Sequence, residues 1–240
     1  MGRDCKKDDG SVRRGCKEMN TELELDKGAI HETVLNLISE EPRGLLLDAG
    51  AGSGALSLEL YKLDFDVIAV DINNYFKAKE IEDRIEFVLS ELDTGAPFKN
   101  GTFDLVVSVE VIEHLENPWH FVRELSRVLK VGGKLYLTTP NIHSIHQRIY
   151  FLFYKPFYFF YMGDFEENKH ITPIPFWNLE RMLNIAGFKI ERVTFNRSFF
   201  PKIKIKNKNL KAPESFLFGE NLIVVAKKVK NPLKWCEKYG

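Results

Sequence analysis

Short apolar runs alternate with stretches of helical periodicity between residues 26 and 140. Unbroken apolar runs of this length are typical of strands covered on both faces of a sheet. The predicted strands are Leu45–Leu47, Val67–Asp71, Ile85–Ser90, Phe103–Val109 and Lys134–Pro140. Strands that alternate with helices at this spacing predict parallel crossovers, and therefore a doubly wound α/β sheet.

Helices are expected in the intervals between these strands. One begins with Asp26 as its N-cap, a second covers Ala55–Tyr61, and a third begins at Asn117-Pro118, a cap and first-turn proline in the favoured order. We expect Gly132-Gly133 to end this third helix.

The alternating rhythm stops after Pro140. A helix is predicted again over Phe176–Ala186, with Gly187 past its end, and two last strands over Phe188–Phe195 and Asn221–Lys228. The complete prediction is a seven-stranded, mostly parallel, Rossmann-like sheet with an inserted segment.

The chain divides into a single domain between two tails. Residues 1–20 are charged and without periodicity, which predicts a disordered tail. Residues 21–230 form the domain, in which 141–172 is the insert, and residues 231–240 are a C-terminal tail. A basic loop separates the last two strands and contains Lys202, Lys204, Lys206, Lys208 and Lys211.

Charge and cysteine content narrow the partners and the compartment. Lysine plus arginine and aspartate plus glutamate both number 34, so a dedicated nucleic-acid binder is disfavoured. Three cysteines, an odd number without a C-x-x-C pair, suit a reducing compartment. The first residues have no apolar run like that of a signal peptide, and no stretch of 18 apolar residues occurs. We expect a cytoplasmic protein.

A glycine-rich loop, residues 48–54, follows the first predicted strand. Glycines there allow a tight turn and a close approach of the backbone to a ligand. Gly50, Gly52 and Ala55 fit the dinucleotide fingerprint loosely, so a nicotinamide-dependent oxidoreductase is one alternative. Asp48 would repel a pyrophosphate but suits a cationic amino group, and Asp71 ends the second strand where it can accept both ribose hydroxyls.

Four stretches in this order resemble class I S-adenosylmethionine-dependent methyltransferases of the type 11/23 kind, and are similar to the O-methyltransferases of the ubiquinone pathway. They are LLLDAGAGSG, VIAVDI, FDLVVSVEVIEHL and RVLKVGGKLYLTTPN, and the resemblance runs from about residue 28 to 228. It implies a methyltransferase that uses S-adenosyl-L-methionine and releases S-adenosyl-L-homocysteine.

The resemblance also implies roles for individual residues. Asp48 and Gly50 would face the methionine end of the cofactor, and Gly52 and Gly54 would line its approach. Asp71 would bind the ribose hydroxyls, and Ile72 would lie against the adenine.

Two further positions complete the expected cofactor site. Glu91-Leu92 stands where relatives receive the adenine amino group, with Asp93 as the competing choice. Glu110, after the fourth strand, is also expected at the cofactor.

Histidines near the ends of the fourth and fifth strands are candidates for catalysis. A base is needed where the acceptor is a hydroxyl or a cationic amine. His170 is the first choice, because the family has a recurring histidine before this helix; His114 in EVIEHL is the second, and His143 and His146 follow. His170 could equally pin the insert through a hydrogen bond to backbone.

A metal site is an alternative for the same region. The spacing of Glu110, Glu113 and His114 resembles the metal-binding stretch of small-RNA 2′-O-methyltransferases and of some ubiquinone-pathway enzymes. With His170 these residues could hold Mg²⁺ or a similar ion, although the same phrase occurs in relatives with no metal role. Because the chain is neutral, the RNA version is disfavoured.

An aromatic run, residues 149–162, has Phe or Tyr at nine of its fourteen positions. As a lid over the acceptor site or a membrane-facing surface it suits a greasy acceptor; as core or a dimer contact it would be structural. The expected function is methyl transfer, most readily to oxygen, on a small-molecule, lipid or glycan acceptor. A non-catalytic cofactor-binding or partner-binding module is the alternative.

Overall fold

The computed structural model describes residues 30–76, 79–160, 169–196, 203–205, 208–210 and 215–232. The expected tail 1–20, the cap Asp26, the three cysteines and the end of the aromatic run lie outside these ranges.

Seven strands form one sheet in the order β3-β2-β1-β4-β5-β9-β6. Their bounds are β1 Leu45–Ala49, β2 Asp66–Asp71, β3 Glu86–Leu89, β4 Phe103–Ser108, β5 Leu129–Pro140, β6 Phe188–Phe195 and β9 Asn221–Lys228. Neighbouring strands are parallel from β3 to β5, whereas β9 runs antiparallel to β5 and β6. The predicted seven-stranded, mostly parallel sheet is confirmed.

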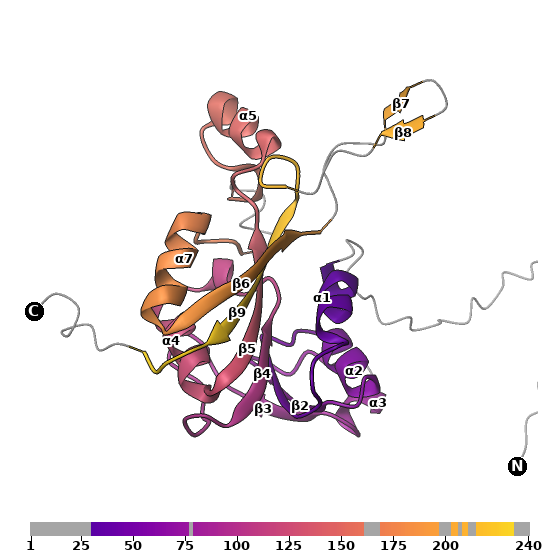
Figure 1. Cartoon of the computed structure of the whole chain (residues 1–240), viewed down its shortest axis with the longest axis vertical. Coiled ribbons are helices and arrows are strands. Elements are labelled where there is room, and N and C mark those ends of the chain that lie inside the picture. The colour runs from indigo at the N-terminus through magenta and orange to yellow at the C-terminus, as the bar shows by residue number, and fades with distance from the viewer. Residues whose placement is uncertain are drawn as a thin grey trace, which may run out of the picture.

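Helices cover both faces of this sheet, as the buried apolar strands require (Figure 1). On one face lie α1 Ile30–Ile38, α2 Ala55–Lys62 and the short α3 Lys79–Glu82; on the other lie α4 Pro118–Val128 and α7 Phe176–Ile185. Each face has its own apolar core: Ile30 and Leu58 pack on the first, and Phe121 and Leu179 on the second. Because the strands from β3 to β5 are parallel, their carboxyl ends lie on the same side of the sheet. With both faces covered by helices, this side is where a ligand can reach the strand ends.

The predicted start of α4 is confirmed, whereas its predicted end at Gly132-Gly133 is wrong. The Asn117 side chain accepts the backbone N–H of His120 at 2.9 Å, and Pro118 is the first helical residue. The helix ends at Val128, and Gly132-Gly133 lies within β5 rather than at the helix end. A Cβ on Gly133 would lie 2.6 Å from the carbonyl oxygen of Asp104, so this glycine lets β5 approach β4.

The insert contains a helix that the aromatic run did not predict. Helix α5, Ile145–Tyr154, is followed by a short 3-10 turn, η2, at Tyr158–Phe160. Gln147 is the only buried residue of α5, and Figure 1 shows the helix standing beyond the end of the sheet. The described part of the aromatic run is therefore not core of the domain.

The expected basic loop contains a two-stranded ribbon, β7 Ile203–Ile205 and β8 Lys208–Leu210, instead of loop alone. Lys204 and Lys208 lie on these strands; Lys202, Lys206 and Lys211 are outside the described residues. Among the described helices, none combines the length and the apolar character needed to cross a bilayer.

Candidate active site

A cavity of about 460 Å³ opens where β1, β2 and β4 end. It is lined by Gly50, Gly52, Asp71, Ile72, Tyr75, Glu91, Leu92, Asp93, Glu110, Val111, His114, Leu115 and Lys169. This set includes eight of the eleven site residues expected from the sequence; Asp48, Gly54 and His170 are outside it.

The glycine loop shapes the floor of the cavity. The backbone N–H groups of Gly50 and Ala51 donate to the carbonyl of Val70 at 2.8 and 3.1 Å, which turns the chain back over β2. Gly50 has φ +86°, and a Cβ there would collide with the Val111 side chain. At Gly52, φ +52°, a Cβ would meet nothing within 4 Å, so this glycine faces open space.

Gly54 serves packing instead of contact with a ligand. It precedes α2 with φ +77°, and a Cβ there would lie 2.7 Å from the Phe76 ring and 2.9 Å from Ile81. The expectation that Gly54 lines the approach to the cofactor is therefore not supported by its position.

Asp71 reaches the cavity from the end of β2. Its Oδ2 accepts the N–H of Gly52 at 2.8 Å and its Oδ1 accepts the N–H of Ile72 at 2.7 Å. Because each carboxylate oxygen has two lone-pair sites, both can accept a further hydrogen bond from the cavity side. The two existing bonds fix the orientation of the carboxylate.

Asp48 lies beneath the loop, where it is 1% exposed. Burial raises its pKa to about 6; the Ser57 hydroxyl, which donates to Oδ2 at 2.6 Å, opposes this, and the nearby charge of Asp71 adds to it. Asp48 does not line the cavity, so its position does not allow direct contact with a ligand there.

Glu91 and Asp93 occupy different positions on the adjacent wall. Asp93 accepts the backbone N–H groups of Glu116 and Asn117 at 3.1 and 2.9 Å, so both its oxygens already bind the segment that leads into α4. Glu91 is exposed, and its carboxylate makes no hydrogen bond with the described residues. Of the two choices left open by the sequence, Glu91 is the one whose carboxylate is not already bound within the described chain.

Glu110 follows β4 with the backbone in the left-handed region, φ +54°. Such a conformation costs a non-glycine residue about 1–3 kcal/mol and is often found at functional sites. Its Oε1 accepts the Thr138 hydroxyl at 2.9 Å and its Oε2 accepts the Asn221 amide at 3.3 Å.

A cluster of three side chains lies at one end of the cavity. One ligand atom each from Glu113, His114 and His170 falls within 4.8 Å of the others, and the two imidazole ring centres are 4.7 Å apart. Glu110 is not a member of this group. The structure thus brings together three of the four expected residues.

Both histidines of the cluster are oriented by backbone carbonyls. Nδ1 of His114 lies 3.3 Å from the carbonyl oxygen of Lys169, and Nδ1 of His170 lies 2.9 Å from that of Phe159. A carbonyl only accepts, so in the neutral ring each Nδ1 carries the proton and each Nε2 carries a lone pair.

Glu113 is fully buried beside these rings. Burial raises its pKa well above the ordinary value, and the charge of Glu110 adds to this effect. Oε2 accepts the Thr139 hydroxyl at 3.1 Å, whereas Oε1 has no hydrogen-bond partner among the described residues. A buried carboxylate oxygen of this kind is costly unless a ligand or a proton satisfies it.

The remaining histidine candidates lie elsewhere. Nε2 of His143 accepts the N–H of Phe176 at 2.9 Å, which commits that nitrogen to holding the start of α7. His146 packs edge-on against Tyr158 in the insert, with ring centres 5.0 Å apart. Neither lines the cavity, and no residue from 141 to 160 does, so a lid formed by the aromatic run is not confirmed.

Lys169, Tyr75, Val111 and Leu115 line the cavity without having been expected there. Val111 and Leu115 lie inside the recognised stretch FDLVVSVEVIEHL, and Tyr75 and Lys169 lie within a few residues of VIAVDI and His170, so position was their only signal in the sequence. With them the wall has four carboxylates, Asp71, Glu91, Asp93 and Glu110, against one lysine. A cavity of this charge favours a cationic ligand and disfavours a pyrophosphate.

Comparisons with known proteins agree with this geometry. Residues 47–137 match the family model of a methyltransferase domain. A ubiquinone biosynthesis O-methyltransferase from Aliivibrio fischeri is 30% identical over 117 residues, 45% of this chain and 50% of that protein. The chain therefore spans about half the length of the curated relatives it matches first.

Solved structures extend the likeness to most of the chain. A candidate methyltransferase from Bacillus halodurans has a TM-score of 0.63 at 20% identity, covering 85% of this chain and 100% of that one. An S-adenosylmethionine-dependent methyltransferase from Archaeoglobus fulgidus has a TM-score of 0.56 at 19% identity, covering 82% and 94%. At such identities the likeness shows a shared fold.

Proposed function

We propose that the chain is an S-adenosylmethionine-dependent methyltransferase of class I, and that it transfers a methyl group to an oxygen of a small-molecule or lipid-like acceptor. The observation that carries the proposal is the acidic cavity at the strand ends. S-adenosylmethionine bears a sulfonium and an ammonium group, and four wall carboxylates against one lysine favour such a ligand over a dinucleotide.

The residues of the cavity fit this cofactor. A volume of about 460 Å³ is within the usual range of ligand pockets. Asp71 would accept the ribose hydroxyls, Ile72 and Leu92 would contact the adenine, and Glu91 would accept its amino group. Gly50 and Gly52 would let the backbone approach the methionine part, near Glu110.

Asp48 and Gly54 support the site from below. Asp48 would act through the loop and α2, because its carboxylate is buried against Ser57. Gly54 would keep α2 close to Phe76.

The transfer itself makes modest demands on the protein. When bound, the cofactor supplies an activated methyl group. In such a transfer the acceptor oxygen would bond to the methyl carbon as the carbon–sulfur bond broke, with the electron pair of that bond left on sulfur. The chain's own residues align the acceptor and take its hydroxyl proton.

We assign the proton to the pair His114 and His170. Each Nε2 carries a lone pair, because each Nδ1 donates to a backbone carbonyl. His114 lines the cavity and would be the nearer acceptor; His170 lies beside its ring and also holds the carbonyl of Phe159.

A divalent-cation site is a second candidate role for the same cluster, and Glu113 favours it. A proton acceptor needs one imidazole, whereas this cluster adds a buried carboxylate oxygen without a partner among the described residues. One carboxylate and two imidazoles suit Mn²⁺, Fe²⁺ or Zn²⁺. Such an ion would lower the pKa of an acceptor hydroxyl.

The insert supports a peripheral contact with lipid as the route to a greasy acceptor. On α5, Leu152 and Phe153 are 74% and 73% exposed, and Arg148 and Lys155 flank them. No acidic residue occurs from His143 to Phe160. An exposed apolar face flanked by cations is complementary to an anionic bilayer surface.

Two measurements test the methyltransferase proposal. In calorimetric titrations, S-adenosylhomocysteine should bind and NAD should not; Asp71→Asn should weaken the binding by about 1.5–3 kcal/mol, the scale of hydrogen bonds to a charged group. Labelled methyl transfer into a cell lysate, counted separately in lipid and aqueous fractions, should then give the acceptor class. Binding of NAD without S-adenosylhomocysteine would contradict the proposal.

A further inference from the structure

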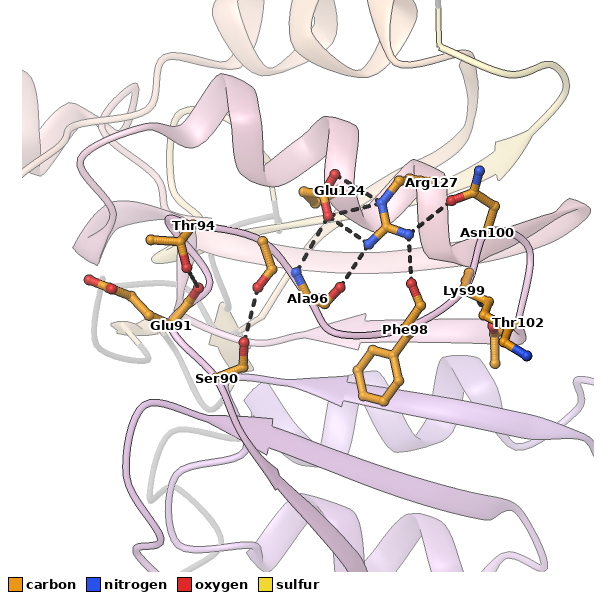
Figure 2. A network of polar contacts seen from close by, with 11 residues as sticks. Ser90, Glu91, Thr94, Ala96, Phe98, Lys99, Asn100, Thr102, Glu124 and Arg127 are labelled. Carbon is orange, nitrogen blue, oxygen red and sulfur yellow. Dashed lines mark hydrogen bonds and ion pairs between the residues drawn. The ribbon is translucent and has the colours of Figure 1, made fainter.

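The segment between β3 and β4, residues 90–100, lies along α4 and is bonded to it at both ends; we call it the strap. At one end Asp93 accepts the N–H groups of Glu116 and Asn117, directly before α4 begins. At the other end the last turn of α4 reaches over the strap with Arg127, as Figure 2 shows.

Arg127 uses its whole donor set on this attachment. Nη1 donates to the carbonyl of Phe98 at 2.6 Å and to Oδ1 of Asn100 at 2.9 Å, and Nη2 donates to the carbonyl of Ala96 at 2.7 Å. Nε and Nη2 also bind the carboxylate of Glu124 at 2.8–3.0 Å. A lysine, with three donors at one point, could not reproduce this planar fork.

Glu124 holds the guanidinium in place and touches the strap itself. Burial would raise the pKa of Glu124, but the hydrogen bonds and charge of Arg127 outweigh it and lower the pKa, so the pair is ionised. Oε2 accepts the N–H of Ala96 at 3.4 Å. A Cβ on Gly95, φ +125°, would lie 3.2 Å from this oxygen, so the strap lies directly on the helix.

The attached turn is also the wall of the cavity. Glu91, Leu92 and Asp93 line the cavity, three to five residues from the anchored Ala96. The turn between them is closed, because the carbonyl of Glu91 accepts the N–H groups of Thr94 and Gly95 at 3.1 and 3.3 Å. A displacement at Ala96 would therefore be passed on to the wall.

We propose that Arg127 and Glu124 are positioning residues that set the affinity of the cavity for the adenosine part of its cofactor. Neither lines the cavity. They act by holding the wall of Glu91–Asp93 against α4, so that the ligand does not have to order it on binding. This inference rests on the proposed function, in which that wall receives the adenine.

The test compares ligand affinity with stability. Arg127→Met keeps the length of the side chain and removes all its donors. Well below the melting temperature, we expect its Kd for S-adenosylhomocysteine and for methylthioadenosine to rise about tenfold, through lost preorganisation. KM for S-adenosylmethionine should rise in parallel while kcat stays close to that of the wild type.

Lys130→Met is the matched control. Lys130 is the second residue of β5 and forms an exposed ion pair with Asp104, 2.7 Å long. The substitution removes this ion pair without changing any contact of the strap. Its affinity should equal that of the wild type even if its melting temperature falls. Asn100→Ala and Glu124→Gln, which each remove part of the attachment, should give intermediate Kd values if Arg127→Met does not fold.

Two results separate the failures. If the wild-type chain does not bind S-adenosylhomocysteine, the proposed function is wrong, and the positioning role of Arg127 and Glu124 is wrong as well. If the wild type binds and the folded strap variants bind equally well, only the positioning role is overturned.

Discussion

At the scale of single residues, the acids around the cavity differ in what already binds them. Asp93 and Asp71 each accept two backbone N–H groups, one on each oxygen, whereas Glu113 has one oxygen satisfied and one without a partner among the described residues. Carboxylates therefore serve as a structural cap, a candidate ligand acceptor and a candidate metal ligand within one site.

The cluster of Glu113, His114 and His170 leads to the first prediction. Excess chelator should abolish methyl transfer and leave the Kd for S-adenosylhomocysteine unchanged, and added Mn²⁺ should restore turnover. Glu113→Gln should need more Mn²⁺, whereas His146→Ala, a histidine outside the cluster, should not. Full turnover in chelator would leave the two histidines as the proton acceptors.

Asp48 leads to a prediction about pH. Its pKa is about 6 in the folded chain against an ordinary value of 3.8, so the folded state holds an extra proton between these values. Its contribution to stability therefore falls as pH rises from about 4 to 6. Relative to the wild type, Asp48→Asn should gain about 2 kcal/mol in free energy of unfolding between pH 4 and pH 7.

Urea titrations at the two pH values measure this gain. Ser57→Ala supplies the opposite control, because it removes the bond that lowers the pKa and should make the loss of stability with pH larger. Parallel behaviour of the wild type and Asp48→Asn would show that folding does not raise the pKa of Asp48.

Among the elements, α5 has an unusual pattern of burial. On one side its aromatic rings pack on each other, with Tyr150 and Tyr154 stacked at 4.6 Å; on the other, Leu152 and Phe153 face solvent. An apolar helix that buries only Gln147 gains little from the domain, so its exposed side favours contact with something else.

Vesicle co-sedimentation tests this surface. The wild type should bind phosphatidylglycerol vesicles more strongly than phosphatidylcholine vesicles, and Leu152→Ser with Phe153→Ser should lose most of the binding. Arg148→Gln and Lys155→Gln should each weaken only the anionic preference, by about 1 kcal/mol. Val131→Ser, an exposed apolar residue on β5, is the control. A lipid-independent dimer that the double variant disrupts would point to self-association instead.

The strands and the cofactor motifs could be predicted from the sequence, and α5 and the strap could not. Leu45–Leu47 or Phe103–Val109 must be covered on both faces, so their apolar runs identify them. The last five residues of α5 are all apolar, and an unbroken apolar run does not distinguish a helix from a strand. Arg127 binds backbone carbonyls 29 and 31 residues away, and a carbonyl leaves no mark on the sequence.

At the scale of the molecule, two covered faces leave one edge where motifs far apart in the chain converge. Asp71, Glu91, Glu110 and Lys169 come from four separate segments, and all line one cavity. A ligand there contacts every segment and therefore opposes unfolding of the domain as a unit.

Thermal unfolding measures that coupling. S-adenosylhomocysteine at 100 times its Kd should add about 2.7 kcal/mol and raise the melting temperature by about 5–10 °C. NAD at the same concentration should leave it unchanged. An equal shift with NAD would favour the oxidoreductase alternative.

The position of β9 has a consequence for synthesis. This strand lies between β5 and β6 in the sheet. In the chain it comes after β6, which ends at Phe195, whereas β9 begins only at Asn221. As the nascent chain leaves the ribosome, β5 and β6 emerge with their facing edges unpaired and must wait for residues 221–228. Exposed strand edges invite pairing with other chains. If translation slowed between residues 196 and 221, the edges of β5 and β6 would stay unpaired for longer. We therefore expect the need for a chaperone to be greatest during this interval.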